Sequence, residues 1–140
     1  MVQIIAGNKG KGKTKYLLEK VKGEVRDILG KVDCLDKNTS HMYELNNKIR
    51  LIVVPDYVVE NTDEFLGFIS GIISQDHDLQ QVYLDSFLQI ACVGDTSIEH
   101  ALEKLSKLSE KFHVDFILSI SMDASELPEM AKSVAEITAL

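Results

Sequence analysis

The sequence predicts an α/β fold, a three-layer sandwich in which helices cover both faces of a mostly parallel, five-stranded sheet. Short apolar runs alternate with longer segments of helical periodicity, the pattern of repeated strand–helix–strand units. Four of the five runs end at or near an aspartate, a common residue where a strand passes into a helix. The 140 residues, 45% of them hydrophobic, suffice for one core, so we expect a single domain over residues 1–140.

The first elements expected are a strand, a helix and a second strand. Residues 2–6 form a brief run with β-branched side chains, which favours a buried strand. From residue 13 to about residue 29 the apolar side chains follow 3–4 spacing, which predicts a helix with Gly23 as a weak point and Gly30 as its end signal. Residues 31–35 predict the second strand.

The middle of the chain continues the alternation. Residues 39–45 have an ambiguous pattern, which a short helix fits, and residues 50–54 form the clearest strand, stopped by Pro55. A helix then starts at Asn61, a capping residue followed by acidic side chains, and runs to residue 73. Residues 81–85 predict the fourth strand.

The last third of the chain predicts a long helix, a fifth strand and a final helix. Residues 95–97 are capping residues before a helix whose apolar positions extend to residue 112. Residues 115–121 form the fifth apolar strand. The final helix is predicted from residue 125, with Pro128 near its first turn.

Composition disfavours several classes of function. The net charge of −7 argues against a general nucleic-acid or membrane-surface binder, because such proteins are usually basic. No apolar run approaches the ~20 residues that span a bilayer, and we find no export signal. Cys34 and Cys92 have neither zinc-binding nor disulfide spacing. We therefore expect a cytoplasmic protein without membrane or nucleic-acid partners.

The strongest signal is the segment of residues 7–14, which matches the pattern GxxxxGK[ST] at every fixed position. Gly7 and Gly12 let the backbone turn and approach an anion, and successive amides there line a concavity for phosphate oxygens. The following helix points its N-terminal dipole at the same charge. Lys13 would reach the β- and γ-phosphates, and the Thr14 hydroxyl would ligate Mg²⁺. The candidate nucleotide-binding residues are Gly7, Asn8, Lys9, Gly10, Lys11, Gly12, Lys13 and Thr14.

A second candidate is Asp85, which ends the apolar run of residues 81–85. On these two features the chain resembles the P-loop NTPase superfamily, with residues 7–14 similar to its Walker A motif and Asp85 similar to its Walker B aspartate. The resemblance implies ATP and Mg²⁺ as cofactors, with Thr14 and Asp85 as the metal-binding pair. We expect the Asp85 carboxylate to face the Thr14 hydroxyl across a gap wide enough for one ion and a water.

Some parts of an efficient nucleotide hydrolase are missing. Many ATP-hydrolysing members of that superfamily have a glutamate after the Walker B aspartate, where this chain has Ser86. Arg26 and Arg50 are the two arginines, and the sequence places neither well as an arginine finger. The guanine-reading pattern NKxD is absent from the sequence, which disfavours GTP. We expect slow or partner-dependent ATP hydrolysis.

Two other functions stay open. One is a phosphotransferase acting on a small substrate, with Asp36, Asp56 or Asp123 as its base, and the other is a nucleotide-sensing interaction module without chemistry of its own. The chain also resembles a group of short bacterial P-loop proteins, some labelled twitching-motility ATPases. We do not transfer that role, because the acidic and histidine boxes of pilus-retraction ATPases are not found in this sequence. A protein partner is compatible with each alternative, and the oligomeric state is not assigned.

The remaining polar residues receive no role. Residues 75–78, Gln-Asp-His-Asp, precede the fourth strand at its amino end and predict a solvated turn away from the expected ligand edge. His41, His100 and His113 have no recognisable partner in the sequence.

Overall fold

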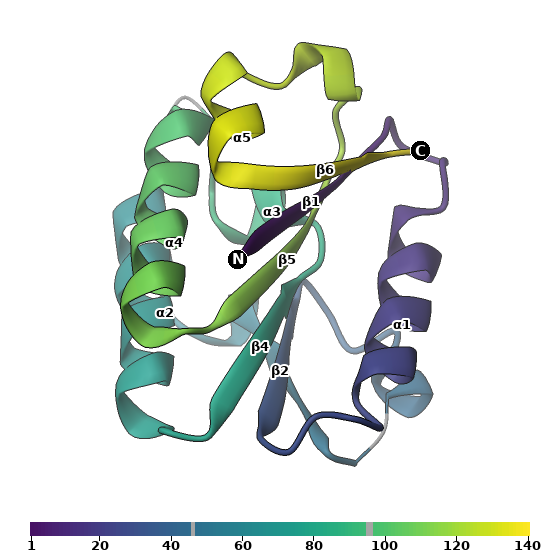
Figure 1. The fold of residues 1–140 in the computed structure, drawn as a ribbon, viewed down its shortest axis with the longest axis vertical. Helices are drawn as coiled ribbons and strands as arrows, with labels where there is room; N and C mark the ends of the chain where they lie inside the picture. Colours follow the sequence, from purple (N-terminus) through teal and green to yellow (C-terminus); the bar gives the residue numbers. More distant parts are fainter. Residues whose placement is uncertain (46, 95–96) are drawn as a thin grey trace.

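Six parallel strands form one sheet within residues 1–45, 47–94 and 97–140, the part of the chain that this computed structural model describes. Their order is β3-β2-β4-β5-β1-β6 (Figure 1). The strands are β1 (Val2–Ala6), β2 (Lys31–Asp36), β3 (Ile49–Val53), β4 (Leu79–Leu84), β5 (Asp115–Ile120) and β6 (Ala135–Ala139). The α/β class and the parallel sheet are confirmed. Since β5 alone separates β1 from β4, the carboxyl ends of these two strands lie one strand apart.

The predicted number of five strands is wrong, because a sixth strand follows the last helix. That helix, α5 (Glu129–Val134), is short and comes after a 3₁₀ turn, η3 (Ala124–Glu126). The chain then runs along β1 as β6, with Val2 opposite Ala135. No residue of β6 is buried, so the strand has no apolar run to reveal it. Hydrogen bonding to β1 makes this segment a strand.

The other helical elements are α1 (Lys13–Glu24), α2 (Thr62–Gln75), α3 (Phe87–Ile90), α4 (Ile98–Phe112) and the 3₁₀ turns η1 (Met42–Glu44) and η2 (Val54–Asp56). α1 ends at Glu24 rather than near residue 29, one residue after Gly23, where the sequence predicts a weak point. Gly30 has another purpose, because a Cβ there would lie 2.2 Å from the carbonyl oxygen of Asp78. Gly30 therefore lets the chain entering β2 pass close to the turn before β4. This turn is the one that the sequence predicts at residues 75–78.

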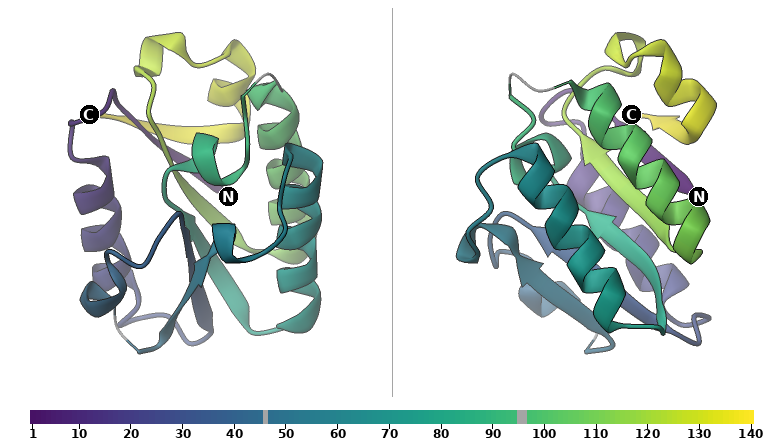
Figure 2. Two further views of the ribbon diagram at one scale, coloured as in Figure 1. Left: turned by 180° about the vertical axis from the view of Figure 1, so that it is seen from behind. Right: turned by 90° about the vertical axis from the view of Figure 1, so that its left-hand side faces the viewer.

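Helices cover both faces of the sheet, so the expected three layers are present (Figure 2). α1 packs on one face through side chains such as Leu17, and α2 and α4 pack on the other through Phe65 and Leu102. Successive residues of a strand point to opposite faces. Val82 of β4 accordingly belongs to the core beneath α2 and α4, and its neighbour Tyr83 to the core beneath α1.

Side-chain caps start α2 and α4 where the sequence predicts them. Asn61 accepts a hydrogen bond from the Glu64 amide at 2.9 Å, and Ser97 accepts one from the Glu99 amide at 3.1 Å. Each cap satisfies an amide that has no partner within its helix. Residues 95–96, the rest of the predicted α4 cap, lie outside the described residues.

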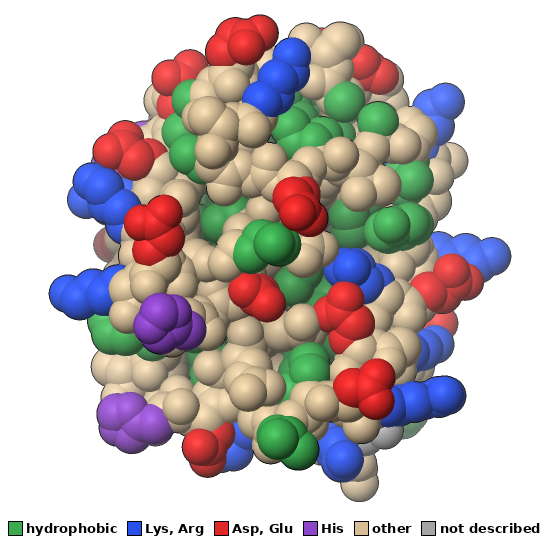
Figure 3. Space-filling model, in the orientation of Figure 1, with side chains coloured by type: hydrophobic (Ala, Val, Ile, Leu, Met, Phe, Trp, Pro, Cys, Tyr) green, Lys and Arg blue, Asp and Glu red, His purple; other side chains and the backbone are tan. Residues whose placement is uncertain are grey.

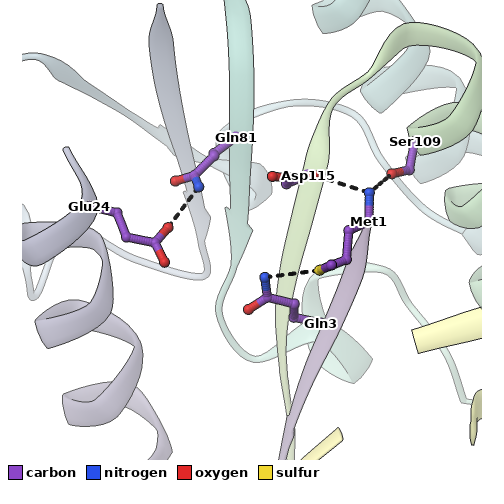
Figure 4. A network of polar contacts seen from close by, with 6 residues as sticks. All are labelled: Met1, Gln3, Glu24, Gln81, Ser109 and Asp115. Atoms are coloured by element: carbon purple, nitrogen blue, oxygen red, sulfur yellow. Dashed lines mark hydrogen bonds and ion pairs between the residues drawn. The ribbon is translucent and has the colours of Figure 1, made fainter. Parts of the chain in front are cut away.

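Polar side chains fasten the helices to the sheet at the amino ends of the strands (Figure 4). The Met1 ammonium donates to the Ser109 hydroxyl of α4 and, at 3.0 Å, to the Asp115 carboxylate at the start of β5. The Glu24 carboxylate at the end of α1 accepts from the Gln81 side-chain amide of β4 at 2.7 Å. These contacts hold α1 and α4 in place at the edge opposite the carboxyl ends of the strands.

Candidate functional site

A cleft of about 510 Å³ lies at the carboxyl ends of the strands, where parallel sheets bind their ligands. Its walls are the glycine-rich loop (residues 7–14), the residues that end or follow β2, β4 and β5, and the start of α3. Lys9, Lys13, Lys15 and Lys37 all line it. The cleft is therefore locally cationic in a chain of net charge −7, which favours an anionic ligand.

The glycine-rich loop has a left-handed backbone at two positions. The φ angles are +91° at Gly10 and +84° at Gly12, in a region that costs an L-residue about 1–2 kcal/mol. Gly12 is the residue before α1, so the first-turn amides of that helix, which have no partner inside it, begin at the loop. Gly7 donates its amide to the Ile120 carbonyl at 3.3 Å, which ties the loop to the end of β5. Backbone donors and a helix N-terminus thus meet at one place, as phosphate binding requires.

Lys13 is buried inside this loop, with 8% of its surface exposed. Its ammonium donates to the Asn8 carbonyl at 3.3 Å, a bond that spans the loop. Burial lowers the pKa of Lys13 from its ordinary 10.5, and the negative charge of Asp85 offsets part of that shift. A buried cation bonded to a backbone carbonyl is well placed to exchange that bond for a stronger one to an anion.

Asp85, at the end of β4, connects the loop to β5. Thr14 donates its hydroxyl hydrogen to Asp85 Oδ2 at 3.0 Å, and Ser119 donates to Oδ1 at 2.5 Å. The Ser86 amide in turn donates to the Ser119 hydroxyl oxygen at 2.8 Å. The expected gap between Asp85 and Thr14 is not present, because the hydroxyl reaches the carboxylate directly. Ser86, not Asp85, is the residue that precedes α3.

The direct contact is compatible with a metal ion at Thr14. A hydroxyl has one hydrogen and two lone pairs, so Thr14 Oγ1 can donate to Asp85 and ligate a cation at the same time. Hydroxyl and carboxylate oxygens are hard ligands, and Mg²⁺ prefers such ligands together with water and phosphate oxygens. The side chains present therefore fit Mg²⁺.

Asp36 and His41 approach Asp85 from the β2 side. One ligand-type atom from each of these three residues lies within 4.8 Å of the others. Asp36 ends β2 and is 4% exposed. Burial raises the pKa of Asp36 above its ordinary 3.8, the Lys37 amide opposes this by a hydrogen bond, and the negative charge of Asp85 adds to it. Asp36 thus joins Asp85 as a buried carboxylate at this edge.

The other residues considered from the sequence lie elsewhere. Asp56 is exposed in η2 and is not among the residues that line the cleft. Asp123 accepts a hydrogen bond from the Ser125 amide at 3.0 Å and caps η3. Among the described residues, neither Arg26 nor Arg50 lines the cleft. Of the three predicted strand-end bases, Asp36 lies beside Asp85, although it does not line the cleft.

Ser119 and His41, which both lie near Asp85, were not singled out from the sequence. Ser119 is a polar residue inside an apolar strand, which is a weak hint of a special position. His41 has no such signal, because its closeness to Asp36 and Asp85 depends on the course of the chain between β2 and η1.

A comparison with solved structures finds a similar fold in the flagellar accessory protein FlaH from Methanocaldococcus jannaschii, with a TM-score of 0.58 and 12% sequence identity. The match covers 95% of this chain and 65% of that protein. At this identity the likeness shows the fold alone, an α/β fold with a parallel sheet. No protein family and no curated protein matches the chain. Across the described ranges, every helix falls short of the length or apolar composition that crossing a membrane demands.

Proposed function

We propose that this chain is a single nucleotide-binding domain that binds ATP with Mg²⁺ and hydrolyses it slowly or only with a partner. The observation that carries the proposal is the hydrogen bond from Thr14, the last residue of the glycine-rich loop, to the buried carboxylate of Asp85. The motif in the sequence and the fold support the same function independently. The buried Cys34 and the partly buried Cys92 are both free thiols, in keeping with a cytoplasmic protein.

Each part of the site has a role in this proposal. The loop amides and Lys13 bind the phosphates, and the start of α1 adds its dipole. Thr14 ligates Mg²⁺, while Asp85 orients Thr14 and holds the ion through water. When bound, Mg²⁺ neutralises charge on the phosphates. The base is adenine rather than guanine, because the NKxD pattern is absent from the sequence.

Slow hydrolysis follows from the groups that are missing around the phosphates. Ser86 stands where many hydrolases have a glutamate, and its amide bonds to Ser119. An arginine finger is worth about 10³–10⁵ in rate, and neither arginine lines the cleft among the described residues. We expect turnover below about one per minute, against a typical enzyme median of ~10 per second.

A small-molecule phosphotransferase is the second candidate, and the position of Asp36 favours it. A carboxylate with a raised pKa close to Asp85 is suited to accept a proton from an acceptor hydroxyl. Nucleic acid is not a substrate we propose. On the face shown in Figure 3, acidic and basic side chains of the described residues are interspersed, so this face presents no extended basic surface.

Thermal unfolding with ATP, GTP and Mg²⁺ tests the proposal. At 100 times Kd, a ligand stabilises by about 2.7 kcal/mol, which for a domain of this size raises Tm by about 9 °C. Mg²⁺ with ATP should give a shift of this kind, and GTP a smaller one. Lys13→Ala should lose most of the shift relative to its own Tm without ligand, whereas Lys107→Ala, at an exposed α4 position, should keep it. An equal shift in Lys13→Ala would refute nucleotide binding by the loop.

Phosphate release from the purified chain measures the second half of the proposal. We expect release below about one per minute, close to the background of Lys13→Ala. Brisk, Lys13-dependent release would contradict the slow reaction and make Asp36 the first residue to mutate.

A further inference from the structure

Three ligand-type side chains meet beside the cleft, and the sheet explains why. β2 and β4 are adjacent parallel strands, with Leu35 opposite Leu84 and the Asp85 amide bonded to the Leu35 carbonyl at 3.0 Å. Asp36 and Asp85 are the next residues along each strand, so their carboxylates lie side by side. His41 returns from the loop after β2 and completes the group, in which the three ligand atoms lie within 4.8 Å of one another.

The two carboxylates of the group are both buried. Asp36 and Asp85 are each 4% exposed. The Lys37 amide donates a hydrogen bond to Oδ1 of Asp36 at 2.6 Å. Neighbouring buried carboxylates repel each other and lose hydration, a cost that a bound cation offsets.

The imidazole of His41 is held as metal-binding histidines are. Its Nδ1 lies 2.7 Å from Oε2 of Glu44, three residues along the chain. A carboxylate on one ring nitrogen fixes the tautomer and orientation of the ring, and leaves the other nitrogen as the ligand. Glu44 therefore makes Nε2 of His41 the atom available to a cation.

The geometry points to a second cation site, in which Asp36, His41 and Asp85 bind a divalent transition metal such as Zn²⁺ or Co²⁺. A set of two carboxylates and one imidazole suits such metals, whereas Mg²⁺ prefers oxygen ligands alone. Zn²⁺ binds these ligands at about 2.0–2.2 Å, which puts the ligand atoms about 3–4 Å apart, so an inward shift of the ligand atoms by about 1 Å closes the site. The site requires no nucleotide and shares only Asp85 with the proposed ATP site.

Calorimetric titration of the full chain with Zn²⁺, in the absence of nucleotide, tests this proposal. We expect one Zn²⁺ per chain and no displacement by equimolar Mg²⁺. His41→Ala should weaken binding at least about tenfold, and Glu44→Gln should weaken it by roughly 10- to 100-fold, the range typical for loss of a group that orients a ligand. His77→Ala, at an exposed position in the turn before β4, should bind as the wild type does.

Two further variants and a spectrum separate this site from the nucleotide site. Lys13→Ala should keep its affinity for Zn²⁺ while losing ATP, and His41→Ala should keep its thermal shift with ATP and Mg²⁺. Co²⁺ in place of Zn²⁺ should show visible bands that His41→Ala loses. Unchanged Zn²⁺ affinity in His41→Ala, or a near-ultraviolet thiolate band that places Co²⁺ on a cysteine, would overturn the proposal even if ATP binding holds.

Discussion

Ser119→Ala removes one hydroxyl that joins three segments of the site. That hydroxyl donates to the Asp85 carboxylate at 2.5 Å and accepts from the Ser86 amide at 2.8 Å, and Ser119 is 1% exposed. Ser86 has a left-handed backbone, with φ at 55°, which the bond to Ser119 helps to hold. Of the two hydroxyls that donate to Asp85, the substitution leaves only that of Thr14. It also removes the acceptor of the Ser86 amide.

The structure supports a sizeable loss of stability in this variant. A hydrogen bond to a charged group contributes about 1.5–3 kcal/mol, and a buried donor left without a partner costs about 1–3 kcal/mol. Because these effects are not additive, we expect a decrease of about 2–4 kcal/mol in the free energy of unfolding, or a Tm lower by about 7–14 °C. A less constrained Asp85 should also weaken Mg²⁺-dependent ATP binding by about 1 kcal/mol, roughly fivefold.

Urea denaturation and ATP titration of the same preparations measure both effects. Ser133→Ala is the matched control, because the exposed Ser133 hydroxyl donates within α5, to the Met130 carbonyl, and its loss should change stability by less than about 0.5 kcal/mol. If Ser119→Ala were as stable as Ser133→Ala and bound ATP equally well, Ser119 would have no part in positioning Asp85.

Two further predictions concern the backbone and a buried charge. An added Cβ meets no atom within 4 Å at Gly12 or at Gly23, and of the two only Gly12 has a positive φ. Gly12→Ala should therefore destabilise by about 1 kcal/mol, and Gly23→Ala should stabilise by about 0.5–1 kcal/mol. Equal shifts in the urea midpoints of the two variants would contradict this. Burial raises the pKa of Asp33 above 3.8, so the native state keeps the Asp33 proton to a higher pH than the unfolded chain does. Stability therefore falls as the pH rises from the unfolded-state pKa to the folded-state pKa. Asp33→Asn should lack this fall, and parallel stability curves between about pH 4 and pH 8 would argue against it.

Much of the candidate site can be predicted from the sequence, because its signals are local. Residues 7–14 need glycine where the backbone is left-handed, and the structure has positive φ at Gly10 and Gly12. Asp85 follows an apolar strand and does reach Thr14, although by direct contact rather than across a gap. The roles of these residues toward ATP and Mg²⁺ stay predictions that the experiments above test.

Other features depend on contacts between distant parts of the chain. β6 has no buried residue, and it is a strand because β1 offers it an open edge. Gly30 was predicted to end a helix, whereas the carbonyl of Asp78, which lies beside it in space, is what excludes a side chain there.

The sequence by itself determined the alternation of strands and helices, the glycine-rich loop and the carboxylates at the strand ends, because periodicity, capping and backbone freedom are properties of neighbouring residues. Only the tertiary structure decided which of those strand ends are adjacent. The order of the strands places β5 between β1 and β4, which brings Ser119 to Asp85, and places β2 beside β4, which brings Asp36 and His41 to the same carboxylate. Strand order depends on burying both faces of the sheet at once, and no short segment of the sequence contains that information.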